Sequence, residues 1–303
     1  MTTLTSAHAG RAILTMCLGV ILMVTSDAIS KWLVERYHPL QILLLRCLIA
    51  APMLATFITL TRGAHRLRSA KPLVHVLRGL LVVFAAWCFF LALKNLPLDT
   101  AVTIGFTAPM FIAAISGPLL KERVGRDRWL AILVGFAGVL VIVRPGAGVF
   151  GPEALWPVGA AFFYGLVLVA ARFIDVRDDF LTMTFWMSVT PVVFCLPVLF
   201  VDWPEPEPLD WVLFPAVAVI ATLGTALLSQ AFRLAPAAVV APFDYTALIW
   251  ASLFGWLIWG TVPSIWTYLG AGVIVACGLY LMFTERRARR LEEMLPDPGR
   301  PLP

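Results

Sequence analysis

The chain has 303 residues, of which 60% are hydrophobic and only 14% are charged, and its mean hydropathy is +0.89. A soluble domain carries about 25% charged residues, and apolar surface in such excess cannot be buried inside one globule. The composition therefore excludes a soluble protein, and the net charge of +5 is relevant to membrane orientation rather than to nucleic-acid binding.

Apolar runs follow one another along the whole chain, and a helix that crosses a bilayer needs about 20 such residues. The runs lack the alternating polarity of membrane β-strands. The first run follows Arg11, and because no small-residue cleavage pattern ends it, we expect an uncleaved span rather than a signal peptide. The sequence therefore predicts an all-α polytopic membrane protein with ten transmembrane helices, over residues 12–33, 39–60, 73–93, 98–120, 129–144, 154–172, 180–201, 211–233, 238–259 and 264–283.

The Lys and Arg residues are divided unequally between the two sides of the predicted membrane region. With the N-terminus in the cytoplasm, most of the 23 lie in cytoplasmic segments, whereas the outer loop VDWPEPEPLD is purely acidic. The exceptions are the mid-membrane Arg46 and the outer residues Lys31, Arg36, Lys94 and Arg144. The distribution predicts a multi-pass protein of the inner (plasma) membrane with both termini cytoplasmic, at 1–11 and in a basic tail at 285–303.

Two stretches about 139 residues apart resemble each other, LKNLPLDTAVTIGFTAPMF at 93–111 and FRLAPAAVVAPFDYTALIW at 232–250. In both, a basic residue precedes a proline and then a helix of small and aromatic residues. WLAILVGFAGVLVI at 129–142 similarly matches WTYLGAGVIVACGL at 266–279. Because an odd number of predicted spans separates the copies, the second copy is inverted in the membrane. Inverted repeats are typical of secondary transporters, with the substrate site near the midplane between the halves.

Three stretches resemble the EamA repeats of the drug/metabolite transporter (DMT) superfamily: LLLRCLIAAPMLA, the stretch from ALKNLPLDTAV to GFAGVLVI, and RLAPAAVVAPFDYTALIWASLFGWLIWG. The resemblance covers nearly the whole chain except the tail. It implies two inverted five-helix repeats, at 12–144 and 154–284, which work by alternating access. The family's second-helix arginine falls on Arg46, and the glutamate that ends its fourth helix falls on Glu122.

The second copy departs from this pattern, with Gly260 and Thr261 where the glutamate would stand and Leu248 in place of Pro109. Whether the two halves move equivalently is therefore open.

Within the superfamily, HVLRGLLVVFAAW and APFDY resemble bacterial permeases that import S-adenosylmethionine or riboflavin. The resemblance implies a permease for a small organic metabolite. Since the superfamily includes importers and exporters, export of amino acids, related metabolites or drugs remains an alternative. The ATP-binding pattern GxxxxGK[ST] does not occur, so we expect no direct use of ATP. Proton coupling, exchange and facilitated diffusion all remain open.

Three charged residues fall inside the first two predicted spans, where an ionised side chain costs about 2.5–3.5 kcal/mol without a partner or water. Asp27 and Lys31 are four residues apart and share one helix face. At 1.5 Å per residue, Asp27 and Arg46 lie at similar depths, about 9 and 10 Å below the outer surface. We therefore predict an Asp27–Arg46 ion pair with Lys31 one turn above. The triad either holds two helices together or, for Asp27, takes part in the transport pathway.

On the cytoplasmic side, Arg78 lies about 7 Å into the third span and Asp244 about 9 Å into the ninth. We expect them to form a gate that closes in the outward-open state, or Arg78 to meet lipid phosphate instead. Asp244 is the first candidate for a coupling or substrate-binding carboxylate. Aromatic rings can stack on planar substrates or cations, and a side-chain amide can form a hydrogen bond to a substrate. The remaining candidates are Trp87, Phe106, Tyr164, Gln230, Tyr245 and Trp250. Helix packing alone also explains an aromatic or amide residue at each of these positions.

The cysteines and histidines of the sequence form no recognisable metal or catalytic site. The five cysteines form no CxxC pattern and the four histidines show no metal-ligand spacing, so we expect no metal, no cofactor and no catalytic residues. A membrane-embedded enzyme, the alternative class, would need a histidine–acid or nucleophile–base set that is absent here. The expected partners are a small-molecule substrate, membrane lipids and, if transport is coupled, a proton. Nucleic acid is not expected, and a monomer and a homodimer remain equally open.

Overall fold

The structure is a computed structural model that describes residues 6–120, 125–144, 151–175 and 178–294. This part of the chain is 86% helix and contains no strand. Within it, eight helices are long and apolar enough to cross a membrane. The prediction of an all-α polytopic membrane protein is therefore confirmed.

The helices follow the predicted spans closely. The α-helices are α1 (Ser6–Val34), α2 (Pro39–Arg62), α3 (Pro72–Asn95), α4 (Leu98–Gly105), α5 (Ala108–Leu120), α6 (Arg126–Val143), α7 (Leu155–Ala170), α8 (Phe180–Cys195), α9 (Asp210–Leu234), α10 (Ala237–Val240), α11 (Ala247–Trp259) and α12 (Ile265–Met294). Short 3₁₀ segments join or extend them: η1 (Ala64–Leu67), η2 (Pro152–Ala154), η3 (Ala171–Phe173), η4 (Leu196–Phe200) and η5 (Ala241–Thr246). Glu122 lies outside the described residues.

Several helix ends are set by local sequence. Pro39 and Pro72 each occupy the first turn of a helix, where the missing N–H of proline costs nothing. His38 and Gln41 add a reciprocal capping box to α2. Gly260 ends α11 with a φ of 67°, which a residue without Cβ adopts freely.

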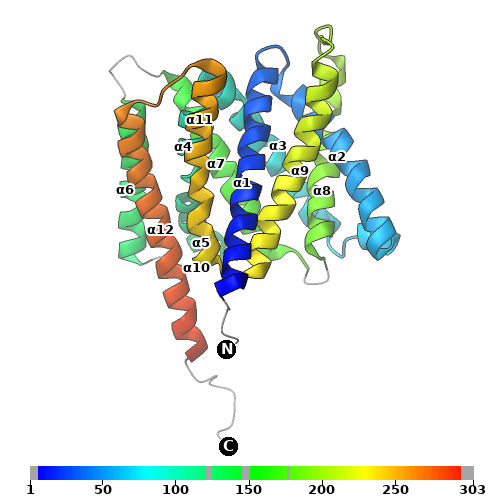
Figure 1. Cartoon of the computed structure of the whole chain (residues 1–303). Coiled ribbons are helices and arrows are strands. Elements are labelled where there is room, and N and C mark those ends of the chain that lie inside the picture. Colours follow the sequence, from blue (N-terminus) through cyan, green and yellow to red (C-terminus); the bar gives the residue numbers. More distant parts are fainter. Residues whose placement is uncertain (1–5, 121–124, 145–150, 176–177, 295–303) are drawn as a thin grey trace, which may run out of the picture.

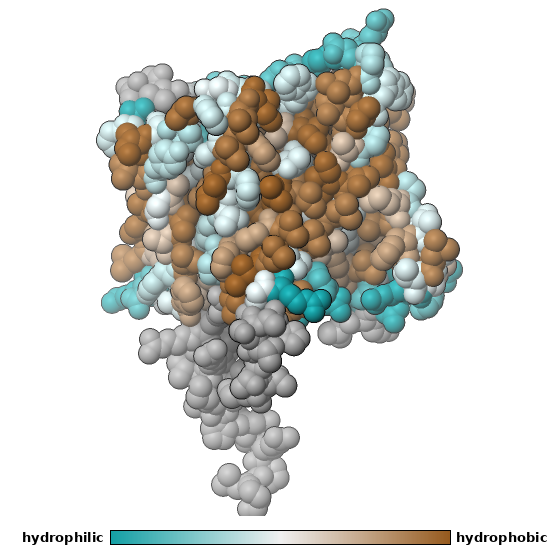
Figure 2. Space-filling model, in the orientation of Figure 1, coloured by the Kyte–Doolittle hydropathy of each residue, from teal (hydrophilic) through white to brown (hydrophobic). Residues whose placement is uncertain are grey.

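The helices form one bundle in which both described ends of the chain lie at the same end (Figure 1). In Figure 1, α6 and α12 lie on the left and α2 and α8 on the right, with α1 and α9 between them. The helices α6 and α12 pack closely because Gly138 and Gly270 face each other. A Cβ added to Gly270 would lie only 2.6 Å from the carbonyl oxygen of Gly138. Apolar side chains cover the outer surface in a broad band, as expected for contact with lipid (Figure 2).

Two of the predicted spans are broken. The span 98–120 divides at Phe106 and Thr107 into α4 and α5, and the span 238–259 passes through α10, η5 and α11. At each break a threonine hydroxyl donates to the carbonyl three residues earlier, Thr107 to Ile104 at 2.7 Å and Thr246 to Phe243 at 2.6 Å. These two threonines hold the same position in the two similar stretches. The same threonine-to-carbonyl hydrogen bond therefore accompanies the helix break in both similar stretches.

The two broken helices run in opposite directions. Lys31 donates to the Leu96 carbonyl at 2.8 Å, just before α4 begins, and its ammonium lies 5.5 Å from the ring of Trp259, where α11 ends. The start of one broken helix and the end of the other therefore lie at the same end of the bundle.

Candidate functional site

A cavity of about 290 Å³ lies between the two broken helices. Its walls come from the α4–α5 break, the end of α7, η5 and α12. Arg128 near the start of α6 and Arg172 of η3, directly after α7, also line it. The start of α6 lies at the same end of the bundle as both described ends of the chain (Figure 1). The lining residues with polar or aromatic groups are Phe106, Ser116, Arg128, Arg172, Asp244 and Tyr245.

Asp244 and Tyr245 reach the cavity from η5. Among the described residues, no hydrogen bond or ion pair engages the Asp244 carboxylate. The ring of Tyr245 contacts that of Phe106, with 4.9 Å between centroids and 39° between planes. Its hydroxyl lies against Gly278 of α12, at a spot that a Cβ would occupy. An unpaired carboxylate and a pair of rings therefore share one cavity.

Arg78 is buried beside this cavity, with 4% of its surface exposed. Its Nε donates to the Val167 carbonyl at 3.2 Å, and its Nη2 lies 3.5 Å from the Met187 sulfur. Its Nη1 is buried without a partner. The predicted Arg78–Asp244 pair is absent from this structure, because the guanidinium is held between α7 and α8 instead.

Lys31 does not join the ionic triad that its spacing predicts. Its ammonium donates to the carbonyls of Leu93 and Leu96 at the end of α3, which have no partner within that helix. A cation at a helix C-terminus also interacts favourably with the helix dipole. Asp27 lies near enough to Arg46 for electrostatic attraction, but the two form no ion pair within 4 Å. The structure therefore lacks the predicted direct Asp27–Arg46 bond, and Lys31, one turn above Asp27, bonds backbone carbonyls.

The other candidates are distributed over the bundle. Tyr164 of α7 lies within electrostatic range of both Arg78 and Asp244 and is 49% exposed. Trp87 of α3 has a buried Nε1 without a partner. Trp250 packs against the main hydrophobic core, and Gln230 is exposed on α9. Of the predicted site residues, Phe106, Asp244 and Tyr245 line the cavity. The others do not line it: Asp27, Arg78, Trp87, Tyr164, Gln230 and Trp250.

Sequence reasoning missed the parts of the cavity that carry no distinctive side chain. Gly278 belongs to a run of small residues that indicates helix packing. Its contact with the Tyr245 hydroxyl joins residues far apart in the sequence and is seen only in the folded structure. Arg172 is one of the basic residues that the charge distribution assigns to the cytoplasmic side, and it lines the cavity. Ser116 had no signal in the sequence.

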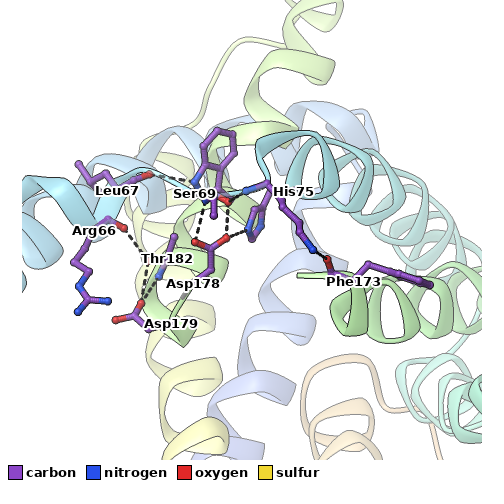
Figure 3. Close-up of polar contacts among 11 residues, drawn as sticks. Arg66, Leu67, Ser69, His75, Phe173, Asp178, Asp179 and Thr182 are labelled. Carbon is purple, nitrogen blue, oxygen red and sulfur yellow. Dashed lines mark hydrogen bonds and ion pairs between the residues drawn. The ribbon is translucent and has the colours of Figure 1, made fainter. Parts of the chain in front are cut away.

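A polar network, the Asp178 network, joins the segment before α3 to the segment before α8 (Figure 3). The Asp178 carboxylate accepts hydrogen bonds from Ser69, the Ala70 amide at 3.3 Å and His75 Nε2 at 3.0 Å. Burial alone would raise the pKa of Asp178, but these three donors outweigh it and hold the pKa below its ordinary value. His75 is fully buried and stacks on Trp186, with 5.6 Å between ring centroids.

Neighbouring bonds extend the Asp178 network. Asp179 caps α8 by accepting from the Thr182 amide at 2.9 Å, and it pairs with Arg62 at 3.3 Å. The Thr182 hydroxyl donates to the Arg66 carbonyl at 2.7 Å. The loop between α2 and α3 is thereby attached to the start of α8 (Figure 3).

A second network, the Asp210 network, lies at the opposite end of the bundle. The buried Asp210 carboxylate accepts from the Tyr37 hydroxyl at 2.8 Å, Arg36 Nη1 at 3.1 Å and the Glu207 amide at 2.8 Å. Burial and the bond to Asp210 raise the pKa of Tyr37 to about 12. Gln41 adds a bond to the Asp202 carbonyl at 3.1 Å. The segment between α1 and α2 is thereby attached to the segment before α9.

Comparison with known proteins adds family information to this geometry. The model of the EamA-like transporter family matches residues 10–144 and 151–284. The S-adenosylmethionine uptake transporter of Rickettsia prowazekii is 27% identical over 276 residues, covering 90% of this chain and 94% of its own. The riboflavin transporter of Vibrio cholerae is 33% identical over 221 residues, covering 72% and 74%.

This chain is also similar to an exporter and to a protein of known structure. The pseudopaline exporter CntI of Pseudomonas aeruginosa is 28% identical over 226 residues, covering 74% of this chain and 79% of its own. A protein of known crystal structure matches with a TM-score of 0.60 over 92% of this chain and 99% of its own. At 22% identity, this last likeness concerns the fold alone. The expected resemblance to the EamA repeats is confirmed.

Proposed function

Because the chain belongs to the EamA-like transporter family, we propose that it imports a cationic metabolite with an aromatic ring, of the type of S-adenosylmethionine, through the cavity at Asp244. The observation that carries the proposal is the unpaired Asp244 carboxylate beside the Phe106–Tyr245 ring pair. The names of the S-adenosylmethionine and riboflavin transporters among its relatives support a metabolite substrate, and the word uptake in the first name supports the inward direction.

The Asp244 side of the cavity, which Arg128 and Arg172 also line, favours a cationic group. A carboxylate away from bulk water needs a compensating positive charge, and among the described residues Asp244 has no ion-pair partner. A sulfonium ion supplies that charge, and the adenine ring that accompanies it can stack on Phe106 and Tyr245. The volume of about 290 Å³ is just below the range of small-molecule sites, about 300–1,000 Å³.

Riboflavin is the second candidate, and the 33% identity to a riboflavin transporter favours it. Its flat ring suits the same pair of aromatic side chains. However, riboflavin is uncharged and leaves Asp244 without a counterion. The two substrates therefore differ in their need for the charge of Asp244.

We also propose the arrangement through which the cavity serves transport. Helix α6 and the α10–α11 segment complete ten spans as two inverted five-helix halves, and both termini are cytoplasmic in the inner membrane. Support comes from the antiparallel broken helices, their matching threonine bonds and the two separate matches to the family model. In this orientation the cavity is the inward-facing state of an alternating-access carrier.

Uptake of labelled S-adenosylmethionine into sealed vesicles that contain only this protein tests the proposal. We expect saturable uptake, which Asp244→Asn abolishes while the protein remains folded. Asp202→Asn removes an exposed carboxylate and serves as the matched control, with unchanged uptake expected. Uptake of riboflavin that survives Asp244→Asn would assign the protein to riboflavin instead. If the vesicles take up neither compound, the proposal fails.

A further inference from the structure

We propose that Arg78 binds a carboxylate of the transported molecule, so that the substrate is a zwitterion with its cationic group at Asp244 and its carboxylate at Arg78. This inference rests on the proposed function and narrows its substrate class. A molecule that carries a cation and no carboxylate would then be a poor substrate.

The first observation is that the Arg78 guanidinium is buried without an anion. Its surface is 4% exposed, and no carboxylate of the described residues pairs with it. Of its donors, Nε bonds one backbone carbonyl, Nη2 has only a weak sulfur acceptor and Nη1 has no partner. A guanidinium has five N–H donors in a planar fork that matches a carboxylate, so the side chain can still bind one.

The second observation is the place of Arg78 relative to the cavity. Its acceptor Val167 directly precedes Leu168 and Val169, which line the cavity. Tyr164, one turn earlier on α7, lies within electrostatic range of Arg78 on one side and Asp244 on the other. One uncompensated cation and one uncompensated anion therefore flank the same helix end.

These two charges together define the ligand. They are not paired with each other, although each lacks a counterion among the described residues. A single zwitterion neutralises both at once, with its carboxylate replacing the Val167 carbonyl as the acceptor of the long arginine side chain. The residues that the sequence predicts as a direct gate are then bridged by substrate.

The alternative role of Arg78 is to stabilise α7, because Val167 lies near the end of that helix and a cation there stabilises the last turn. Lysine can satisfy that role with one bond to the carbonyl. Lysine does not offer the two parallel donors that bind a carboxylate in bidentate fashion. Arg78→Lys therefore separates the two roles.

The test compares S-adenosylmethionine with decarboxylated S-adenosylmethionine, which keeps the adenosyl group and the sulfonium but lacks the carboxylate. Uptake of both by the reconstituted protein is measured for the wild type, Arg78→Lys and Arg78→Gln. The wild type should prefer the carboxylate form. Both variants should reduce uptake of that form by about 10- to 100-fold, the loss expected for a charge-assisted hydrogen bond, and change uptake of the decarboxylated form by less than about twofold.

Retained uptake of the decarboxylated compound shows that a variant is folded and active, so a folding defect cannot imitate the result. Arg126→Gln removes an exposed cation at the start of α6 and should leave the ratio of the two uptake rates unchanged. An equal reduction of both compounds by Arg78→Lys would overturn the inference while leaving the proposed function intact. Absence of uptake of either compound by the wild type would instead overturn the proposed function.

Discussion

Phe106 and Tyr245 hold the same position in the two similar stretches of the sequence, and their rings meet with 4.9 Å between centroids. Residues related by a two-fold operation can touch each other only close to the axis. In the proposed arrangement of two inverted halves, this contact puts the pseudo-two-fold axis at the two helix breaks, beside the cavity that Tyr245 and Asp244 line. Broken helices that meet at such an axis are a common way to build a carrier site.

The contact of Tyr245 with Gly278 gives the sharpest prediction for the cavity. Gly278→Ala adds a Cβ where the Tyr245 hydroxyl lies, so the ring must shift into the cavity and substrate uptake should fall about tenfold. Gly272→Ala is the matched control on the same helix, because nothing lies within 4 Å of its added Cβ. Both changes favour the helix by about 1 kcal/mol, so that effect cancels. Equal uptake by the two variants, measured in vesicles, would contradict the assignment.

Lys31 should matter for stability rather than for transport. Lys31→Met removes the cation that bonds the last carbonyls of α3, and we expect a loss of about 1–2 kcal/mol of unfolding free energy. The thermal unfolding midpoint in detergent measures the loss. Lys94→Met, which removes an exposed cation near the same helix end, should leave the midpoint unchanged. A Lys31→Met protein of normal stability that no longer transports would favour a role on the pathway.

Asp178 should make the stability of the protein depend on pH. Its pKa in the folded protein lies below its ordinary value, so the folded state gains stability above the unfolded pKa of about 3.9 and loses it as the pH falls through the folded value. The midpoint difference between wild type and Asp178→Asn should therefore be constant near neutral pH and shrink below about pH 4. Thermal scans across this range provide the measurement, with the exposed Asp127→Asn as reference. A difference that grows on acidification would refute the role of the ionised carboxylate.

Tyr37 should stabilise the protein through its bond to Asp210. Tyr37→Phe removes one of three donors to a buried carboxylate, which should cost about 1–3 kcal/mol of unfolding free energy. Tyr268→Phe deletes the hydroxyl of a tyrosine that is 55% exposed and should be neutral. If thermal unfolding gives the same midpoint for both variants, the bond does not contribute.

Much of the fold could be predicted from the sequence, because bilayer thickness sets the length of each apolar run and prolines mark several helix starts. The breaks at Phe106 and in η5 do not follow from hydropathy, which counts apolar residues and does not distinguish a broken span from a continuous one, although Pro109 and Pro242 lie beside them. The charged residues show a second limit. Counting residues gives the depth of Asp27 and Arg46 but not the direction in which each side chain points around its helix. Lys31 binds backbone carbonyls of α3, and a residue pattern does not reveal which carbonyls are free.

The Asp178 and Asp210 networks fasten opposite ends of one flank of the bundle, which α1, α2, α3, α8 and α9 build (Figure 1). Both networks are formed in a structure whose cavity lies between the two broken helices, so neither network has to break for that cavity to exist. We propose that this flank stays fixed during transport while α4–α6 and α10–α12 move. Arg78 then lies on the fixed flank and Asp244 on the moving side, so a substrate bound to both residues spans the boundary between them.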